Sequence, residues 1–256
     1  MSGQGCALIT GASSGIGAAF ARALAARGTN LILIARSKEK LEALSCDLEG
    51  KHAISAVSLP ADLSVPGAAA EVAESVQARN LEIDLLVNNA GFGGRGEFHK
   101  LPLDRQLEMI RLDVLAVMEL THLLLPGMVK KRAGGIINVS SVTGFQSIPY
   151  AAVYSATKAF VTSFSMGLAE ELRPHGIPAL MLSACVSASY NSATNQICFN
   201  VPIYGNYCVT SPVQLPVSAQ LKACVQTCGS FIPTGLKVSI YANGTVIYSG
   251  VLWGSC

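Results

Sequence analysis

The sequence lacks the features that mark several large classes of protein. Its 256 residues hold 18 Lys and Arg against 16 Asp and Glu, so there is no basic surplus of the kind that a nucleic-acid surface needs. The opening stretch MSGQGCALITGASSG has no basic segment followed by a long apolar one, unlike a secretory signal. No apolar run reaches the ~18–20 residues of a membrane span. We therefore expect a soluble cytoplasmic protein that binds neither nucleic acid nor membrane.

Acidic residues are missing altogether from the last part of the chain. Residues 183–256 contain two Lys and no Asp or Glu, so all 16 acids lie in residues 1–182. Cysteine has the opposite distribution, because Cys6 and Cys46 are the two of the eight that precede residue 183. We therefore predict two domains, 1–182 and 183–256, and a shift this sharp suggests a fusion or a composite sequence.

Short apolar runs alternate with helix-forming segments throughout residues 1–182. Strands are expected at 6–10, 30–35, 53–58, 83–91, 134–141 and 178–182. Helices are expected at 16–27, 37–50 (with Ser37 as its cap), 67–79, 104–132 (bent near Pro126) and 152–173. This alternation predicts an α/β fold, a Rossmann-type doubly wound parallel sheet covered on both faces. Ligands of such sheets bind at the carboxyl ends of the strands.

The first expected strand runs into the glycine-rich stretch TGASSGIG, residues 10–17. Gly11, Gly15 and Gly17 lie where the strand turns into a helix. A side chain there would keep the backbone away from a pyrophosphate, and the positive end of the helix favours the anion. A plain glycine-rich turn is the alternative, but the position between a strand and a helix favours dinucleotide binding.

The end of the second strand indicates which dinucleotide is bound. An acid about 20 residues after the glycines would bind the ribose 2′-hydroxyl of NAD, whereas this chain has Ala35-Arg36 there. A guanidinium pairs with the 2′-phosphate of NADP. The sequence thus predicts NADP(H), although Arg36 could also be a solvated residue at the start of a helix. At the end of the third strand, Asp62 could accept a hydrogen bond from the adenine amino group.

Three further motifs make the pattern specific. NNAG occupies 88–91, INVSS 137–141 and YSATK 154–158. Together with TGASSGIG and Asp62, in this order and spacing, they resemble the short-chain dehydrogenase/reductase family over residues 5–182. The resemblance implies an enzyme that interconverts a carbonyl and an alcohol by hydride transfer with NADP(H). It implies cofactor contacts at Gly11, Ser13, Ser14, Gly15, Ile16, Gly17, Arg36, Asp62, Leu63, Asn89, Ala90, Gly91, Tyr154 and Lys158.

The resemblance also assigns a catalytic set of Ser141, Tyr154 and Lys158. Tyr154 would be the general acid and base, and the Lys158 ammonium one helical turn on would favour its phenolate and hold the nicotinamide ribose. Ser141 would hydrogen-bond the substrate carbonyl, because Ser140 would point to the opposite side of the strand. Without this context, Tyr154 and Lys158 are equally well two polar residues on an ordinary helix.

Two departures from the family pattern stand out. The family usually has an asparagine where this chain has Asp113, and a carboxylate accepts hydrogen bonds but cannot donate them as an amide does. A proton relay through this position is therefore in doubt. After the sixth strand the family usually shows Pro-Gly, a substrate lid and a further helix and strand. This chain instead reads SACVSASYNSATNQ from residue 183.

Residues 183–256 show no helical period and many β-prone runs. Alternating residues flank Asn243-Gly244, which is a strong hairpin signal. Six cysteines and scarce charge suggest a small secreted all-β module with disulfides, although the sequence cannot choose among 15 pairings. Free buried thiols are the second possibility. A metal site ranks a distant third, because no His follows His175 and the ligands would have to be cysteines alone. We predict no metal site.

Several functions remain open. The leading one is the NADP(H)-dependent oxidoreductase acting on a small apolar carbonyl or alcohol, with Phe92, Phe145 and Tyr150 as pocket candidates. The others are a non-catalytic dinucleotide-binding protein and a secreted β binding module joined to a reductase fragment. The helices 104–132 and 152–173 resemble the subunit-pairing surface of the family, which implies a homodimer or a homotetramer.

Overall fold

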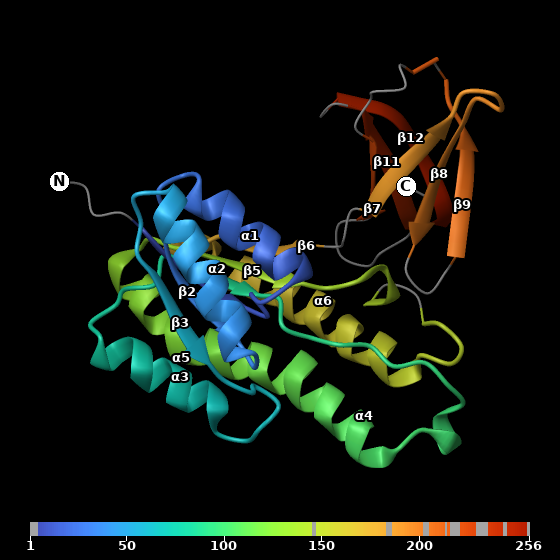
Figure 1. The fold of residues 1–256 in the computed structure, drawn as a ribbon. Coiled ribbons are helices and arrows are strands. Elements are labelled where there is room, and N and C mark those ends of the chain that lie inside the picture. Colours follow the sequence, from blue (N-terminus) through green and yellow to red (C-terminus); the bar gives the residue numbers. More distant parts are fainter. Residues whose placement is uncertain are drawn as a thin grey trace. The chain divides into compact units, whose positions relative to one another are not determined.

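The structure is a computed structural model, and it describes residues 5–144, 147–182, 186–201, 205–212, 214–215, 221–228, 235–242 and 245–254. The chain divides into two compact units, Met1–Leu182 and Ser183–Cys256 (Figure 1).

The first unit is built on a parallel sheet of six strands. They are β1 (Cys6–Thr10), β2 (Asn30–Ala35), β3 (Ala56–Pro60), β4 (Leu85–Asn88), β5 (Gly135–Val139) and β6 (Ala179–Leu182). Their order is β3-β2-β1-β4-β5-β6, so the direction of winding reverses between β1 and β4. The predicted Rossmann-type sheet is confirmed, and ligands of such folds bind at this reversal, beyond the carboxyl ends of the strands.

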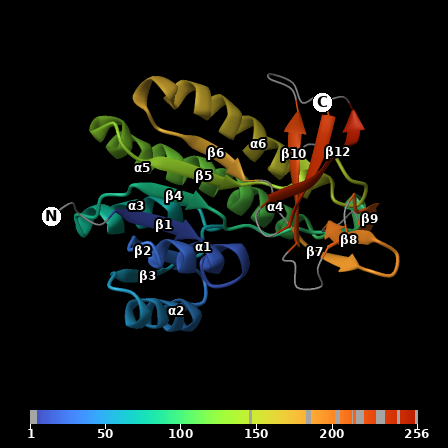
Figure 2. The same cartoon turned by 90° about the horizontal axis from the view of Figure 1, so that it is seen from above.

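Helices connect the strands and cover both faces of the sheet. They are α1 (Gly15–Ala25), α2 (Lys38–Lys51), α3 (Ala68–Ala78), α4 (Leu103–Ile110), α5 (Ala116–Lys131) and α6 (Ala152–Leu172). Helices α1 and α2 lie on one face, and α3, α5 and α6 lie on the other (Figures 1 and 2). Short 3₁₀ turns are η1 (Phe98–Lys100), η3 (Val142–Gly144) and η4 (Arg173–His175), and η2 (Arg111–Leu115) is a π-helical segment between α4 and α5.

Strand β1 shows why its sequence is apolar without alternation. Ala7 and Ile9 pack in the cluster that includes residues of α1 and α2, whereas Leu8 packs in the cluster that includes residues of α3 and α5. All three side chains are fully buried. A strand covered by helices on both faces needs apolar residues at every position.

The structure shifts some expected boundaries in this unit. Strand β3 begins at Ala56 rather than residue 53. Just before it, the Ser55 carbonyl accepts from the Leu31 N–H and the Ser55 N–H donates to Asn30 Oδ1. The fourth strand is restricted to Leu85–Asn88. Ser37 precedes α2 as expected, but its side chain makes no capping hydrogen bond.

The long helix differs from expectation in two ways. Its irregularity is the π-helical segment η2, while Pro126 lies inside α5. In addition, Leu103–Lys131 is long and apolar enough to cross a membrane by length and composition, with a window of mean hydropathy 1.6, while charged residues interrupt it so that it holds no apolar run of that length. About a third of that window (33%) is buried inside the structure, and core helices of soluble proteins pass the same test.

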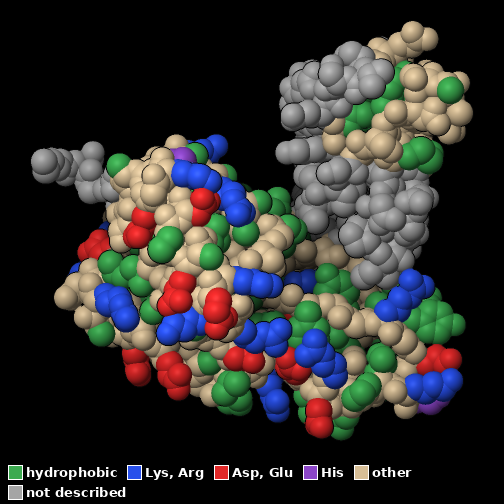
Figure 3. Space-filling view, in the orientation of Figure 1, with side chains coloured by type: hydrophobic (Ala, Val, Ile, Leu, Met, Phe, Trp, Pro, Cys, Tyr) green, Lys and Arg blue, Asp and Glu red, His purple; other side chains and the backbone are tan. Residues whose placement is uncertain are grey.

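The second unit is a six-stranded antiparallel sheet. Its strands are β7 (Val186–Asn191), β8 (Gln196–Val201), β9 (Gly205–Thr210), β10 (Leu221–Cys228), β11 (Gly235–Ala242) and β12 (Thr245–Gly254), in the order β12-β11-β10-β7-β8-β9. The visible face of the first unit carries charged side chains of both signs (Figure 3). In the second unit every strand pairing is antiparallel, and its described residues form no helix. The predicted all-β character is therefore confirmed.

One disulfide fixes neighbouring strands of this sheet. Cys198 and Cys208 face each other across β8 and β9, and they are bonded. The prediction of disulfides in the cysteine-rich segment is confirmed for this pair. Ala242 of β11 pairs with Thr245 of β12, and the Asn243-Gly244 turn predicted between them lies outside the described residues. So do Cys185 and Cys256.

Candidate functional site

The turn between β1 and α1 needs glycine, because some positions have a positive φ and one has no room for a side chain. Gly11 and Gly15 have φ of +65° and +55°, in the left-handed region. A Cβ on Gly17 would collide with the Gly11 carbonyl oxygen and lie 2.6 Å from Asn89 Nδ2. The neighbouring residues Ser14 and Ile16 are exposed at the start of α1, and Ser13 is half-buried. The turn therefore offers bare backbone and a helix N-terminus to a ligand, and the residues fit a dinucleotide.

Thr10 and Asn89 brace this turn against the end of β4. Thr10 Oγ1 accepts hydrogen bonds from the Asn89 and Ala90 N–H groups, both at 2.9 Å. In return, Asn89 Nδ2 donates to the carbonyls of Thr10 at 2.9 Å and Gly11 at 3.3 Å. Asn89 and Ala90 thus fix the glycine turn, beside which a cofactor would lie. Sequence reasoning missed Thr10, whose only signal is its position directly before the first glycine.

Arg36 lies at the end of β2 among acidic side chains. Its guanidinium nitrogen NH1 is 3.6 Å from Glu108 Oε1 and 4.0 Å from Asp62 Oδ2, and its side chain is 62% exposed. Arg36 is thus accessible to an anionic ligand, which would have to compete with two carboxylates.

Asp62 is held by its own loop. Its Oδ1 accepts from the Ser64 N–H at 3.0 Å and from the Ser64 hydroxyl at 2.6 Å. Partial burial raises the pKa of Asp62, but the Ser64 hydrogen bonds and Arg36 together outweigh that effect, and the pKa lies below its ordinary value. The carboxylate therefore stays an acceptor at neutral pH. The Leu63 side chain is buried in the core.

Tyr154 and Lys158 lie one helical turn apart near the start of α6, and Ser141 follows the end of β5. Lys158 Nζ lies 5.8 Å from the centroid of the Tyr154 ring and donates to the Val139 carbonyl at 3.3 Å. Lys158 is 5% exposed, whereas Tyr154 is half-buried. Gly93 lies beside the Tyr154 ring, since a Cβ there would be 3.4 Å from Cδ2. The phenol and the ammonium are therefore close to each other at the carboxyl edge of the sheet, where Lys158 contacts the end of β5.

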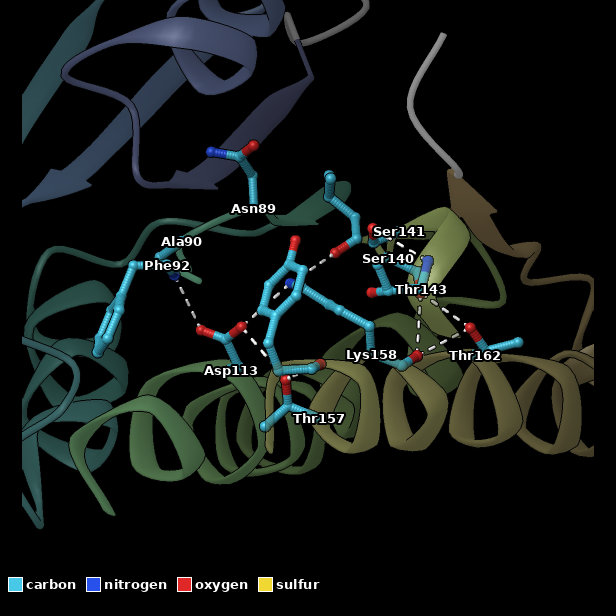
Figure 4. A network of polar contacts seen from close by, with 12 residues as sticks. Asn89, Ala90, Phe92, Asp113, Ser140, Ser141, Thr143, Thr157, Lys158 and Thr162 are labelled. Carbon is cyan, nitrogen blue, oxygen red and sulfur yellow. Dashed lines mark hydrogen bonds and ion pairs between the residues drawn. The ribbon is translucent and has the colours of Figure 1, made fainter. Parts of the chain in front are cut away.

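The two adjacent serines have different surroundings (Figure 4). Ser140 is buried, and its hydroxyl contacts the Lys158 carbonyl at 3.0 Å and Thr162 Oγ1 at 2.8 Å. Ser141 is half-buried, and its Oγ accepts from the Thr143 N–H at 3.3 Å. Ser140 therefore holds α6 against β5, while the hydroxyl hydrogen of Ser141 remains available for another acceptor.

Asp113 is fully buried in η2 and faces the same group of residues. Its Oδ2 is 3.4 Å from Lys158 Nζ, and its Oδ1 accepts from the Phe92 N–H at 3.1 Å (Figure 4). Burial raises the pKa of Asp113 above its ordinary value, although Lys158 and the Phe92 N–H oppose that effect. Asp113 is therefore not a carboxylate on the surface of the helix, because it has no exposed area.

The expected aromatic pocket is not assembled among the described residues. The Phe92 ring packs under the Arg105 guanidinium at 3.8 Å, and Tyr150 is 55% exposed. Phe145 lies outside the described residues, as do residues 183–185, where a Pro-Gly pair was looked for. Within the described part of the chain, no group of three or more His, Cys, Asp or Glu could hold a metal ion.

Comparison with known proteins gives a consistent result for the first unit. Residues 5–194 match the family model of the short chain dehydrogenases. The chain is 33% identical to a very-long-chain 3-oxoacyl-CoA reductase of Anas platyrhynchos, over 86% of this chain and 71% of that protein. It is 37% identical to the protein of that name from Pyrenophora tritici-repentis, over 67% of this chain and 51% of that protein. The chain thus spans only about half the length of some curated relatives.

Solved structures agree with this assignment. A short-chain dehydrogenase from Sphingobium yanoikuyae in complex with NADPH has a TM-score of 0.67 and 37% identity, with 70% of each chain covered. A bulky-bulky ketone specific alcohol dehydrogenase from Comamonas testosteroni has a TM-score of 0.67 and 35% identity, over 70% of this chain and 72% of that one. The chain belongs to the short-chain dehydrogenase/reductase family, as its motifs predicted.

Proposed function

We propose that the protein is an NADP(H)-dependent oxidoreductase that interconverts a carbonyl and an alcohol. The observation that carries the proposal is the buried Lys158 ammonium one helical turn from the half-buried Tyr154, at the sheet edge that also carries the glycine turn. A phenol beside a cation is suited to give and take a proton near neutral pH. Structural neighbours solved with NADPH or NADP support the choice of cofactor.

In this proposal each residue has a defined task. Bound NADPH supplies the hydride. The turn at Gly11, Gly15 and Gly17 holds its pyrophosphate, and Arg36 pairs with its 2′-phosphate. Ser141 donates a hydrogen bond to the substrate carbonyl, Tyr154 gives the carbonyl oxygen a proton, and Lys158 holds the ribose and orients the phenol.

The substrate class follows from the relatives only in outline. Their names include very-long-chain 3-oxoacyl-CoA reductases, and one structural neighbour is specific for bulky ketones. We therefore propose a carbonyl compound with a large apolar substituent, in place of the small apolar one expected from the sequence.

Turnover tests the proposal directly. NADPH oxidation is followed with a panel of apolar ketones and 3-oxoacyl thioesters. Tyr154→Phe is expected to keep NADPH binding, because the ring still packs beside Gly93, and to lose reduction by ~10²–10⁴-fold, because the proton donor is gone. Tyr150→Phe, on the exposed side chain of the preceding loop, is the matched control and should retain activity.

Two other outcomes are informative. NADPH binding without Tyr154-dependent turnover on any substrate would support the non-catalytic dinucleotide-binding alternative, which the buried Asp113 and the β-strand sequence after residue 185 favour. Absence of NADPH binding would contradict both functions.

Cofactor choice forms a separate prediction. NADPH is expected to bind more tightly than NADH, because the accessible Arg36 guanidinium meets the 2′-phosphate. Arg36→Asp should weaken NADPH binding by about tenfold or more, and NADH binding much less. Fluorescence titration of both cofactors with the parent and the variant measures this, and equal affinities in the parent would contradict the assignment.

A further inference from the structure

Asp113 and Lys158 form an ion pair inside the first unit. Asp113 has no exposed area and Lys158 is 5% exposed, so water cannot screen either charge effectively. The distance of 3.4 Å between Oδ2 and Nζ is the only contact between opposite charges that the described structure provides for either residue. A buried charge is costly unless it is paired, so each group depends on the other.

Other contacts of the carboxylate do not replace Lys158. Thr157 Oγ1 lies 3.5 Å from Asp113 Oδ2, but it also lies 2.8 Å from the Tyr154 carbonyl. A hydroxyl has a single hydrogen, and the shorter contact takes it. The Phe92 N–H remains as the second donor, to Oδ1 at 3.1 Å. The negative charge is thus shared between one backbone amide and the Lys158 ammonium.

The backbone on both sides is adapted to this contact. Asp113 lies in the π-helical segment η2, and such segments occur frequently at functional sites. On the facing loop, a Cβ on Gly91 would lie 2.9 Å from Asp113 Oδ1 and 3.2 Å from Lys158 Nζ. A side chain at position 91 would therefore push the pair apart.

The pair changes what Tyr154 experiences. The Lys158 ammonium lies beside the Tyr154 ring, and a carboxylate 3.4 Å from that ammonium cancels part of its field there. Among the described residues, Lys158 is the charged group that acts on Asp113, and the same ammonium lies 5.8 Å from the centroid of the Tyr154 ring.

We propose that Asp113 is a positioning residue that neutralises and orients Lys158, so that proton transfer at Tyr154 operates at higher pH than it would beside an amide. This inference rests on the proposed function for its meaning in catalysis, but the charge coupling itself can be measured in the absence of turnover. Because Asp113 becomes neutral when it takes up a proton, the effect should disappear at acid pH.

The test compares the parent with Asp113→Asn, which keeps the shape and the Oδ1 acceptor for the Phe92 N–H. Near-ultraviolet absorbance measures phenolate formation, and subtracting the same titration of a Tyr154→Phe version of each protein isolates Tyr154. Phenolate formation is expected about one pH unit lower in Asp113→Asn. If the protein reduces a carbonyl, the alkaline limb of the rate profile should move by the same amount, and the parent and variant profiles should converge at low pH.

Two controls separate this effect from a general loss of charge or structure. Asp104→Asn removes a carboxylate from the exposed start of α4 and should leave the titration of Tyr154 unchanged. Asp113→Asn with Lys158→Met removes both charges and should return phenolate formation to near the parent pH. An unmoved titration in Asp113→Asn, or an equal shift in Asp104→Asn, would overturn the proposal. If Asp113→Asn does not fold, Asp113→Ser, which keeps a hydroxyl oxygen as an acceptor without the charge, replaces it in the same titration.

Discussion

Cys6 shows how the surroundings of one residue decide its reactivity. It starts β1 and is buried, and burial, with a smaller effect of Asp84, raises the pKa of its thiol to about 11. The thiolate is the reactive form, so Cys6 stays inert at ordinary pH. Cys46 on α2 is also a free cysteine but is exposed.

We therefore predict selective alkylation of these two cysteines. With iodoacetamide at pH 8, Cys46 should be modified and Cys6 should be protected, whereas both should react in urea. Peptide mapping by mass spectrometry reads each site separately. Modification of Cys6 at the rate of Cys46 in the folded protein would contradict the burial of this thiol.

The site residues were predicted from the sequence to different degrees. The glycines and the Tyr154–Lys158 pair have fixed spacings on single elements, so their placement follows from the elements. The contacts of Thr10 and of the Val139 carbonyl have no such signal in the sequence. They form only when β1 lies beside β4 and β5 lies beside α6 in the folded protein. Asp113 was noticed by its residue type, but its burial depends on η2, a local irregularity that a helical period does not encode.

At the scale of elements, Asp84 connects three of them at the amino edge of the sheet. It precedes β4, its Oδ2 accepts from the Cys6 N–H of β1 at 2.8 Å, and its Oδ1 is 2.6 Å from Lys131 Nζ at the end of α5. Burial raises the pKa of Asp84, but the bonds from Lys131 and Cys6 outweigh it and the pKa lies below its ordinary value.

A pH dependence of stability follows from this lowered pKa. The contribution of Asp84 is present above the unfolded pKa of ~3.9 and is lost as the pH falls through the folded value. Asp84→Asn should lower the free energy of unfolding by about 1 kcal/mol at pH 7, since its side chain is 42% exposed and solvent screens the pair. The difference from the parent should shrink toward pH 3 in urea titrations.

Glu82→Gln is the control for that experiment. Glu82 also faces Lys131, at 3.7 Å, but its side chain is 85% exposed, so its removal should change little at either pH. An equal effect of both variants would show that Lys131 acts through general charge rather than through its bond to Asp84.

Elements of the first unit were predicted well, because apolar runs and glycine stops mark strands that are buried on both faces. The start of β3 was predicted three residues too early, because the apolar residues Ala53 and Ile54 precede the first residue that pairs with β2. In the second unit the β character and the hairpin were predicted, while the Cys198–Cys208 bond was one of many pairings. Which cysteines pair depends on the register of β8 and β9, and the spacing of the cysteines in the sequence does not determine that register.

At the scale of the whole molecule, exposed apolar side chains on the helical segments allow a prediction about subunit assembly. Large apolar side chains on α4, η2, α5 and α6 are exposed, and they are Leu107, Leu115, Met118, Leu123, Phe160 and Met166. Met118 and Leu123 also line a hollow beside α3. Exposed apolar surface of this kind marks an interaction site, so we propose that the protein forms at least a dimer through it.

Light scattering at micromolar concentration tests this assembly. The parent should have at least twice the mass of the chain, and Met118→Glu should shift it toward the monomer. Leu180→Glu is the matched control, because Leu180 is 57% exposed on β6 rather than on these helices. A monomeric parent, or dissociation by both variants, would contradict a specific interface.

The strand order β3-β2-β1-β4-β5-β6 also affects how the protein folds during its synthesis. β1 is the first strand to be synthesised, yet Ala7 pairs with Leu85, and that partner is made 78 residues later. At about 5–20 residues per second, this separation corresponds to roughly 4–16 s on the ribosome. During that time β1, a central strand of the finished sheet, can pair only with β2 once that strand is made, and its other edge stays open. Co-translational misfolding and chaperone binding would therefore act first on CALIT, well before the residues of catalysis exist.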